Sequence, residues 1–193
     1  MNEGHLRHLA SPEWARQIEE ELVPWLESLG DLGDDLLEVG PGPGLTTELL
    51  RRHFARVTAV ELDEDLATAL ADRLDGTNVE VIHADATDTG LPTDSFSAVT
   101  CLTMLHHVPT PELQDRLLVE AHRVLRPGGL LIGIDSVETE ALRAAHVDDI
   151  FVPIDPATFG GRLEAAGFGD VTIDLVGHRA KFTAKKPVPS SGS

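Results

Sequence analysis

Cysteine occurs once in this 193-residue chain, at Cys101. A single thiol excludes an intramolecular disulfide and a zinc site built from cysteines. Long apolar runs are missing as well, since none approaches the roughly 18 residues that a membrane-spanning helix needs. The first residues, MNEGHLRHLASPEW, lack the apolar core of a signal peptide. We therefore expect a cytoplasmic protein without a membrane span.

Basic residues are scarce. The chain has 33 acidic residues against 15 basic ones, and its formal net charge is −18. Such a surface repels phosphate backbones, so we expect no nucleic-acid partner. Two explanations of the acidity stay open. One is a solubilising surface in an organism that favours Asp, Glu and Arg over Lys, and the other is a salt-adapted host.

Strand-like and helical patterns alternate along the chain after an opening helix. Helices are expected at 11–29, 45–54, 65–74, 111–125 and 157–166, and strands at 36–39, 57–60, 79–82, 96–102, 130–134, 171–175 and 179–183. This alternation predicts right-handed βαβ units, and hence a doubly wound, mostly parallel α/β sheet with helices on both faces. The last two strands are close enough in sequence to form an antiparallel hairpin. Pro24 should kink or split the first helix.

A glycine-rich loop follows the first expected strand. Its glycines, Gly40, Gly42 and Gly44, alternate, and Glu38 stands two residues ahead of them. A dinucleotide fingerprint would place its third glycine three residues after Gly42, where this chain has Leu45. A carboxylate at Glu38 would repel a pyrophosphate and attract a cation. The loop therefore favours a ligand with an adenosine-like body and a positively charged amino group, although a plain tight turn would also use glycine.

At these residues the chain resembles the class I S-adenosylmethionine-dependent methyltransferases, and especially the type 11 and ubiquinone/menaquinone-biosynthesis group. Their first motif has the form acid-x-Gly-x-Gly-x-Gly. The turn Arg126-Pro127-Gly128-Gly129 before the fifth strand also matches the family. The resemblance implies a Rossmann-like fold, S-adenosylmethionine as cofactor and S-adenosylhomocysteine as product. We divide the chain into an N-terminal helical cap (1–30), a methyltransferase domain (31–184) and a disordered tail (185–193).

The resemblance also assigns the cofactor contacts along the chain. Glu61, which follows the second strand, would accept the ribose hydroxyl protons, as an acid at this place does in nicotinamide sites too. The remaining implied contacts are Leu62 beside it, Asp85 and Ala86 at the adenine, and Cys101, Leu102 and His107 toward the methionine part, with His107 alternatively holding the loop.

Two histidines follow the fourth strand at the edge where the methyl group should lie. Histidine titrates near neutral pH, so His106 is a candidate base for an oxygen acceptor. The string around it is similar to the ubiquinone-pathway O-methyltransferases, which carry glutamates where this chain has Thr103 and His106, and a histidine that matches His107. Those enzymes use these residues near a divalent metal. Because hard cations prefer oxygen ligands, we do not expect the magnesium-type site of those enzymes here, and a divalent metal stays an open alternative.

A second polar group follows the fifth strand and comprises Asp135, Ser136, His146, Asp148 and Asp149. On a helix, His146 and Asp149 would share one face and could form a base with its orienting acid. Together with Asp135 they could form a weak metal site, or the segment could be a solvated acidic lid. We name His106 and His146 as the catalytic candidates.

The sequence therefore predicts a methyltransferase, a monomer or homodimer, that acts on a small-molecule acceptor, and O-methylation is the preferred hypothesis for its reaction. C-methylation of a quinone-like ring and a non-catalytic S-adenosylmethionine-binding module are the alternatives, and a dehydrogenase is disfavoured by Glu38 and Leu45. The first helix, with Trp14 and Trp25, should pack near the cofactor and help to close the acceptor pocket.

Overall fold

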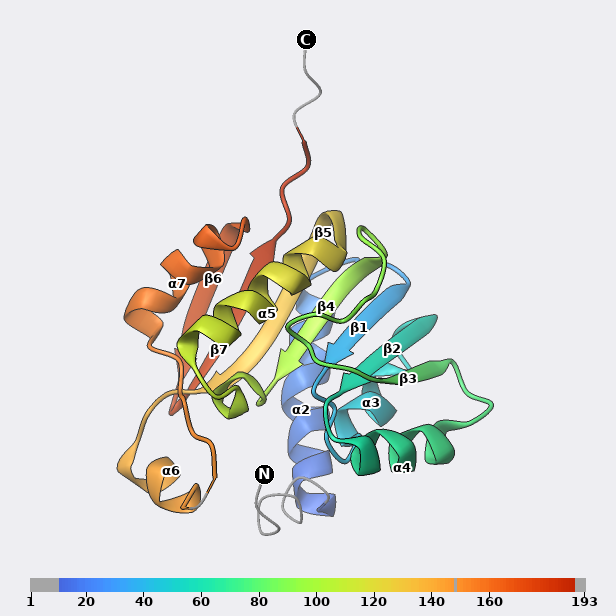
Figure 1. Cartoon of the computed structure of the whole chain (residues 1–193), viewed down its shortest axis with the longest axis horizontal. Coiled ribbons are helices and arrows are strands. Elements are labelled where there is room, and N and C mark those ends of the chain that lie inside the picture. Colours follow the sequence, from blue (N-terminus) through green and yellow to red (C-terminus); the bar gives the residue numbers. More distant parts are fainter. Residues whose placement is uncertain (1–10, 148, 190–193) are drawn as a thin grey trace.

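The computed structural model describes residues 11–147 and 149–189. They form a seven-stranded sheet with the strand order β3-β2-β1-β4-β5-β7-β6 (Figure 1). The strands are β1 (Asp35–Val39), β2 (Arg56–Glu61), β3 (Val79–His83), β4 (Phe96–Leu102), β5 (Leu125–Ser136), β6 (Gly169–Val176) and β7 (Arg179–Lys185). Strands β1 to β5 are parallel, and β7 runs antiparallel to both β5 and β6. The predicted fold class is confirmed.

Helices cover both faces of the sheet. They are α2 (Pro12–Ser28), α3 (Leu45–Leu50), α4 (Glu64–Leu74), α5 (Pro111–Val124), α6 (Glu140–Ala145) and α7 (Pro156–Ala165), with a 3-10 turn, η1 (Leu105–His107). Buried leucines of α2 and α3 pack on one face of the sheet, and α4 packs on Ala59 of the same face. Buried residues of α5 and α7 form a second cluster on the other face.

Local sequence accounts for these elements. All five residues of β1, DLLEV, are buried, as expected for a central parallel strand covered on both faces. Asp63 caps α4 by accepting the backbone N–H groups of Asp65 and Leu66. Thr110 caps α5, and Pro111 occupies its first turn. These caps satisfy amide donors that have no partner inside the helix.

The strand order reverses between β1 and β4, and ligands of such sheets bind beyond the carboxyl ends of the strands at this point. In Figure 1 these ends lie at the lower edge of the sheet, with α6 below the end of β5. The fold therefore brings the glycine loop, η1 and the segment around α6 to one edge.

Several boundaries differ from the sequence prediction. Helix α2 runs through Pro24 without splitting, and α3 ends at Leu50 instead of residue 54. The turn at 126–129 lies inside β5, which starts at Leu125, because a register shift against β4 absorbs it.

The expected tail also starts too early, since Lys185 ends β7 and Lys186 exchanges backbone hydrogen bonds with Gly128 and Gly129 at 2.8 and 2.9 Å. Residues 1–10 of the expected cap and 190–193 of the expected tail lie outside the described residues.

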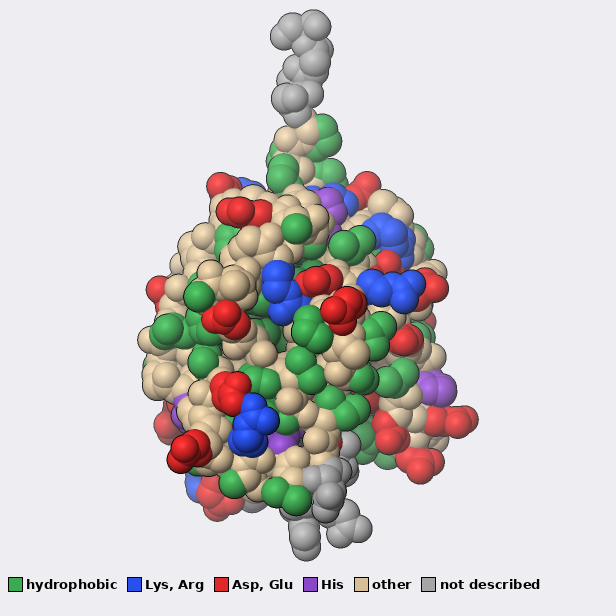
Figure 2. All heavy atoms as spheres, turned by 60° about the vertical axis from the view of Figure 1, so that its left-hand side comes forward, with side chains coloured by type: hydrophobic (Ala, Val, Ile, Leu, Met, Phe, Trp, Pro, Cys, Tyr) green, Lys and Arg blue, Asp and Glu red, His purple; other side chains and the backbone are tan. Residues whose placement is uncertain are grey.

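The charged side chains on the surface reflect the scarcity of basic residues in the sequence. On the face in Figure 2, acidic and basic side chains are interspersed, and the basic ones form no continuous band. In the described residues, no helix combines the length and apolarity that a membrane crossing requires.

Candidate functional site

The glycine loop joins β1 to α3 at the carboxyl edge of the sheet. Gly42 has φ +54, and a Cβ added there would meet no atom within 4 Å. Gly44 has φ +80, but its added Cβ would lie 2.3 Å from Leu70 of α4. Glycine is therefore needed at the two positions for different reasons. Gly44 allows α3 and α4 to pack, whereas Gly42 keeps open space beside a left-handed backbone. At Gly40, an added Cβ would lie 3.1 Å from Met104.

Glu38 lies directly under this loop. Its side chain is 1% exposed, and Thr46 of α3 donates a hydrogen bond to its Oε1. Its Oε2 is buried without a hydrogen-bond partner within residues 11–147 and 149–189. Burial is the main reason why the pKa of Glu38 is raised to about 7. The hydroxyls of Thr46 and Thr47 partly oppose this rise, and the negative charge of Glu61 adds to it. A buried carboxyl group with one unsatisfied oxygen is suited to a cationic ligand.

Glu61 ends β2 and holds the loop. Its Oε2 accepts the N–H of Gly42 at 3.0 Å, and its Oε1 accepts the N–H of Asp63 at 3.0 Å. Both oxygens keep further acceptor capacity that ribose hydroxyls could use. Leu62, the next residue, is 66% exposed beside this edge, as an apolar contact for a ring would be.

The other expected cofactor contacts differ in exposure. Asp85 is exposed and accepts the N–H of Thr87 at 2.8 Å, and Ala86 packs partly against the core. Cys101 is 0% exposed within the core, and burial raises the pKa of its thiol far above the usual range. The side chain of Cys101 points to the α5 face of the sheet, inside the core, and the side chain of Leu102 points to the α2 face.

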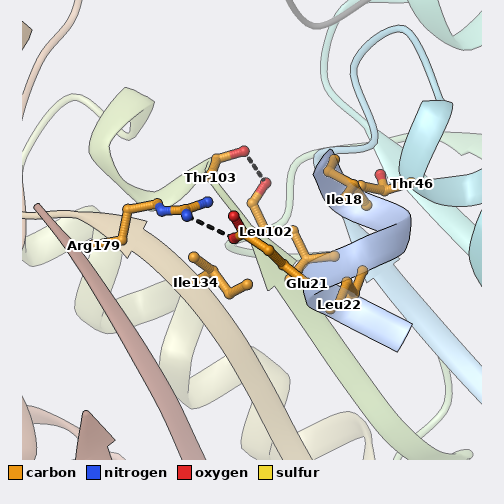
Figure 3. A pocket seen from close by; sticks show the side chains of 8 residues that line it. All are labelled: Ile18, Glu21, Leu22, Thr46, Leu102, Thr103, Ile134 and Arg179. Atoms are coloured by element: carbon orange, nitrogen blue, oxygen red, sulfur yellow. Dashed lines mark hydrogen bonds and ion pairs between the residues drawn. The ribbon is translucent and has the colours of Figure 1, made fainter. Parts of the chain in front are cut away.

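A small hollow lies between α2, Thr46 of α3 and the ends of β4, β5 and β7 (Figure 3). Its walls are apolar except for Thr46, Thr103 and an ion pair in which Arg179 contacts Glu21 at 2.6 Å. The lining residues are Ile18, Glu21, Leu22, Thr46, Leu102, Thr103, Ile134 and Arg179. Helix α2 therefore forms one wall of this hollow, and its closing of an acceptor pocket stays a prediction. Trp25 of α2 is partly buried against the core, and the side chain of Trp14 lies outside the described ones.

Thr103 stands at the rim of the hollow in a strained conformation. Its φ is +55, which is unusual for a residue with a branched side chain. Its N–H donates to the carbonyl of Ile134 at 2.6 Å, which fixes the end of β4 against β5. Strain of this kind persists where the surroundings determine it, and it is concentrated at binding sites.

Three histidines meet on the other side of the same edge. In η1, His106 contacts Asp135 of β5 through Nδ1 and Oδ1 at 2.7 Å, and Asp135 also accepts the N–H groups of Leu105 and Ser136. Nitrogen atoms of His106, His107 and His146 all lie within 4.8 Å of one another. The sequence prediction treated His146 as part of a separate lid group, so this cluster was missed.

The positions of these residues also differ from the expected helix. Helix α6 ends at Ala145, so His146 caps it instead of sharing a helical face with Asp149. Asp149 lies 4.0 Å from His107 Nδ1. Asp148 lies outside the described residues. His106 is 2% exposed and His146 is 7% exposed, and neither lines the hollow. A catalytic base at either histidine stays a prediction.

The doubly wound sheet, the glycine loop at the strand reversal and the buried Glu38 define a cofactor-binding α/β domain whose ligand carries a positive charge. A sequence profile described as a methyltransferase domain matches residues 37–133, half of the chain. The chain therefore belongs to the class I S-adenosylmethionine-dependent methyltransferases, as the sequence resemblance indicated.

Known proteins give further similarities. The ubiquinone biosynthesis O-methyltransferase of Pseudomonas fluorescens is 38% identical over 112 residues, which cover 55% of this chain and 47% of that protein. The chain thus matches about half the length of this relative. A Pyrococcus horikoshii protein of known structure aligns with a TM-score of 0.78 at 19% identity, covering 93% of this chain and 94% of that one. A methyltransferase from Aquifex aeolicus aligns with a TM-score of 0.74 at 22% identity, covering 96% and 99%. At such identities these structures support the fold alone.

Proposed function

We propose that this chain transfers a methyl group from S-adenosylmethionine to an oxygen atom of a small-molecule acceptor. The acceptor would bind at the hollow, which is small in this structure and would widen by movement of α2. The observation that carries the proposal is the position of the hollow, which shares Thr46 with the buried Glu38 and has an ion pair on an otherwise apolar wall. The O-methyltransferase activity named for the Pseudomonas fluorescens relative supports an oxygen acceptor.

The residues present fit the cofactor. Glu38 has a buried oxygen for a cationic amino group, Gly42 leaves open space beside the loop, and Glu61 and Asp85 offer carboxylates at the ends of β2 and β3. The cofactor supplies a methyl group whose transfer forms an oxygen–carbon bond and breaks the sulfonium carbon–sulfur bond. The protein must align the acceptor and accept its proton.

The walls of the hollow favour an acceptor with an apolar body and one hydroxyl group. Ile18, Leu22, Leu102 and Ile134 would contact the apolar part. The Arg179 guanidinium would stabilise the negative charge that develops on the acceptor oxygen. Glu21 is the only described lining residue with a carboxylate or imidazole, so we assign it the acceptor proton.

Methyl transfer from labelled S-adenosylmethionine to a panel of phenols and hydroxylated aromatic acids tests the proposal, with NMR of the product to locate the new methyl group. Glu21→Gln should lower kcat by roughly 10²–10⁴-fold while the affinity for S-adenosylhomocysteine stays unchanged. Glu20→Gln, at the exposed neighbouring position of α2, is the matched control.

The outcomes separate the alternatives. A loss of kcat in His106→Ala, with none in Glu21→Gln, would return the base to the histidines. A product methylated on carbon, with neither substitution lowering kcat, would replace O-methylation by C-methylation. Cofactor binding without turnover on any acceptor would favour a non-catalytic module.

A further inference from the structure

The histidine cluster comprises His106, His107 and His146, and two distant segments build it. His106 and His107 form most of η1 after β4, while His146 follows α6. Ring centroids are 4.2 Å apart for His106 and His107, 5.3 Å for His106 and His146, and 5.4 Å for His107 and His146. The side chains of His106 and His107 are only 2% and 14% exposed, and His146 is 7% exposed. Three imidazoles thus converge at a largely buried site.

Each ring is oriented by an acceptor at Nδ1. His106 faces Asp135 at 2.7 Å, His107 faces the carbonyl of Ile150 at 3.2 Å, and His146 faces the carbonyl of Leu142 at 2.7 Å. Because carbonyls and carboxylates accept, Nδ1 carries the proton in all three rings. In the neutral imidazole, the lone pair is then on Nε2, and the three Nε2 atoms are shielded from solvent.

This is the arrangement of histidines that ligate a metal ion, where the second ring nitrogen donates to a carboxylate or a backbone carbonyl and fixes the tautomer. We propose that His106, His107 and His146 bind one divalent transition-metal ion of the zinc class through Nε2. Nitrogen donors select zinc, cobalt or nickel over magnesium and calcium, which prefer oxygen.

The distances are compatible with metal binding. Zinc–nitrogen bonds of about 2.0–2.1 Å place tetrahedral donors about 3.3 Å apart. One ring nitrogen of each histidine lies within 4.8 Å of a ring nitrogen of the other two, so metal binding would draw the rings together by up to about 1.5 Å. Phe151 stacks on His146 with ring centroids 4.4 Å apart and provides an apolar wall. The donor set also differs from the ubiquinone-pathway pattern described above, because His146 comes from the segment after α6.

The metal would join η1 to the segment between β5 and α7. Backbone and side-chain contacts already link these regions, since Val152 donates to the carbonyl of His106 at 2.8 Å and Gln114 donates to the carbonyl of Val152 at 2.7 Å. The expected consequence is a metal-dependent rise in thermal stability. The inference requires no step of methyl transfer, and its tests use no activity assay.

The experiment uses the full chain without an affinity tag, stripped with a chelator. Cobalt titration should give the intense visible absorption of a tetrahedral site at one ion per chain, and zinc should displace it. Magnesium should have no effect. His146→Ala should weaken binding by at least about 100-fold, more than the loss of an orienting partner usually costs. His53→Ala removes an exposed histidine outside the cluster and should bind like the wild type.

Because His146→Ala could fail to fold, nitrogen NMR of the labelled wild-type chain provides a second measurement. Zinc should shift Nε2 of three of the nine histidines while their Nδ1 protons are retained. The proposal is overturned if the folded wild-type chain binds neither ion, if zinc shifts other histidines, or if a folded His146→Ala variant binds as tightly as the wild type.

Discussion

Replacing Glu38 with glutamine should remove a pH-dependent loss of unfolding free energy, which arises when the buried carboxyl group ionises. The pKa of Glu38 is raised from 4.5 to about 7, mainly because the carboxyl is buried. A raised pKa means that the folded state holds the proton more tightly than the unfolded chain does. The contribution of Glu38 to stability is therefore fully present below pH 4.5 and is lost as the pH rises through 7.

The size of the effect follows from the rise of this pKa from 4.5 to about 7. At about 1.36 kcal/mol per pKa unit, ionising Glu38 costs the folded protein about 1 kcal/mol at pH 5 and about 3 kcal/mol at pH 8.5. Glutamine has nearly the same shape, can still accept the hydrogen bond from Thr46 and does not ionise. Relative to the wild type, Glu38→Gln should therefore gain about 2–3 kcal/mol of unfolding free energy between these two pH values.

Urea denaturation of both proteins at pH 5 and pH 8.5 measures this double difference, in which pH-independent effects of the substitution cancel. Glu80→Gln, at an exposed position of β3, is the control. A double difference below about 0.5 kcal/mol would refute the reasoning. Calorimetry adds a second test. S-adenosylhomocysteine should release about half a proton at pH 7 if its amino group ionises Glu38, and Glu38→Gln should release none.

Three further predictions concern the loop and the core. Gly42→Ala should weaken S-adenosylhomocysteine binding at least tenfold. Gly76→Ala is the control, because Gly76 has a similar φ of +72 and equally open space, and it should not weaken binding. If both variants bind equally well, Gly42 is only a turn residue. Glu61→Gln can accept only one of the two N–H groups of Gly42 and Asp63, so calorimetry should show at least a tenfold loss of affinity. Arg123 is the main reason why the pKa of Glu120 is lowered to about 2. Glu120→Gln should therefore lose up to about 3 kcal/mol of unfolding free energy above pH 4.5 and progressively less as the pH falls toward 2. An equal loss of unfolding free energy above pH 4.5 and near pH 2 would contradict this.

The fold and the cofactor loop could be predicted because their signals are local. The strand and helix periods set the elements, and the alternating glycines after β1 mark the cofactor loop. Glu38 could be identified because its charge disagrees with its place in a buried strand. The prediction of a cation beside it therefore came from one residue and one pattern, both within a few positions of each other.

The hollow and the histidine cluster depend on contacts that no local pattern contains. Glu21 and Arg179 are 158 residues apart, and their ion pair follows from the position of α2 against β7. His146 joins His106 only because the chain turns back after α6. Propensity and spacing do not determine the path of such a loop, so the sequence placed His146 in a separate lid group.

The two polar sites at this edge lie on opposite faces of the sheet. Successive residues of a strand point to opposite faces, so Leu102 and Ile134 line the hollow on the α2 side, while Cys101 and Asp135 face the α5 side. The segment from Thr103 to His107 connects the two sites directly. Because Asp135 already accepts three hydrogen-bond donors, whereas Glu38 keeps a buried oxygen without a described partner, the cation of the cofactor and the proposed metal ion have distinct places. Residues 103–107 therefore link the two sites along the chain, and the strained φ of Thr103 lies at the start of that link.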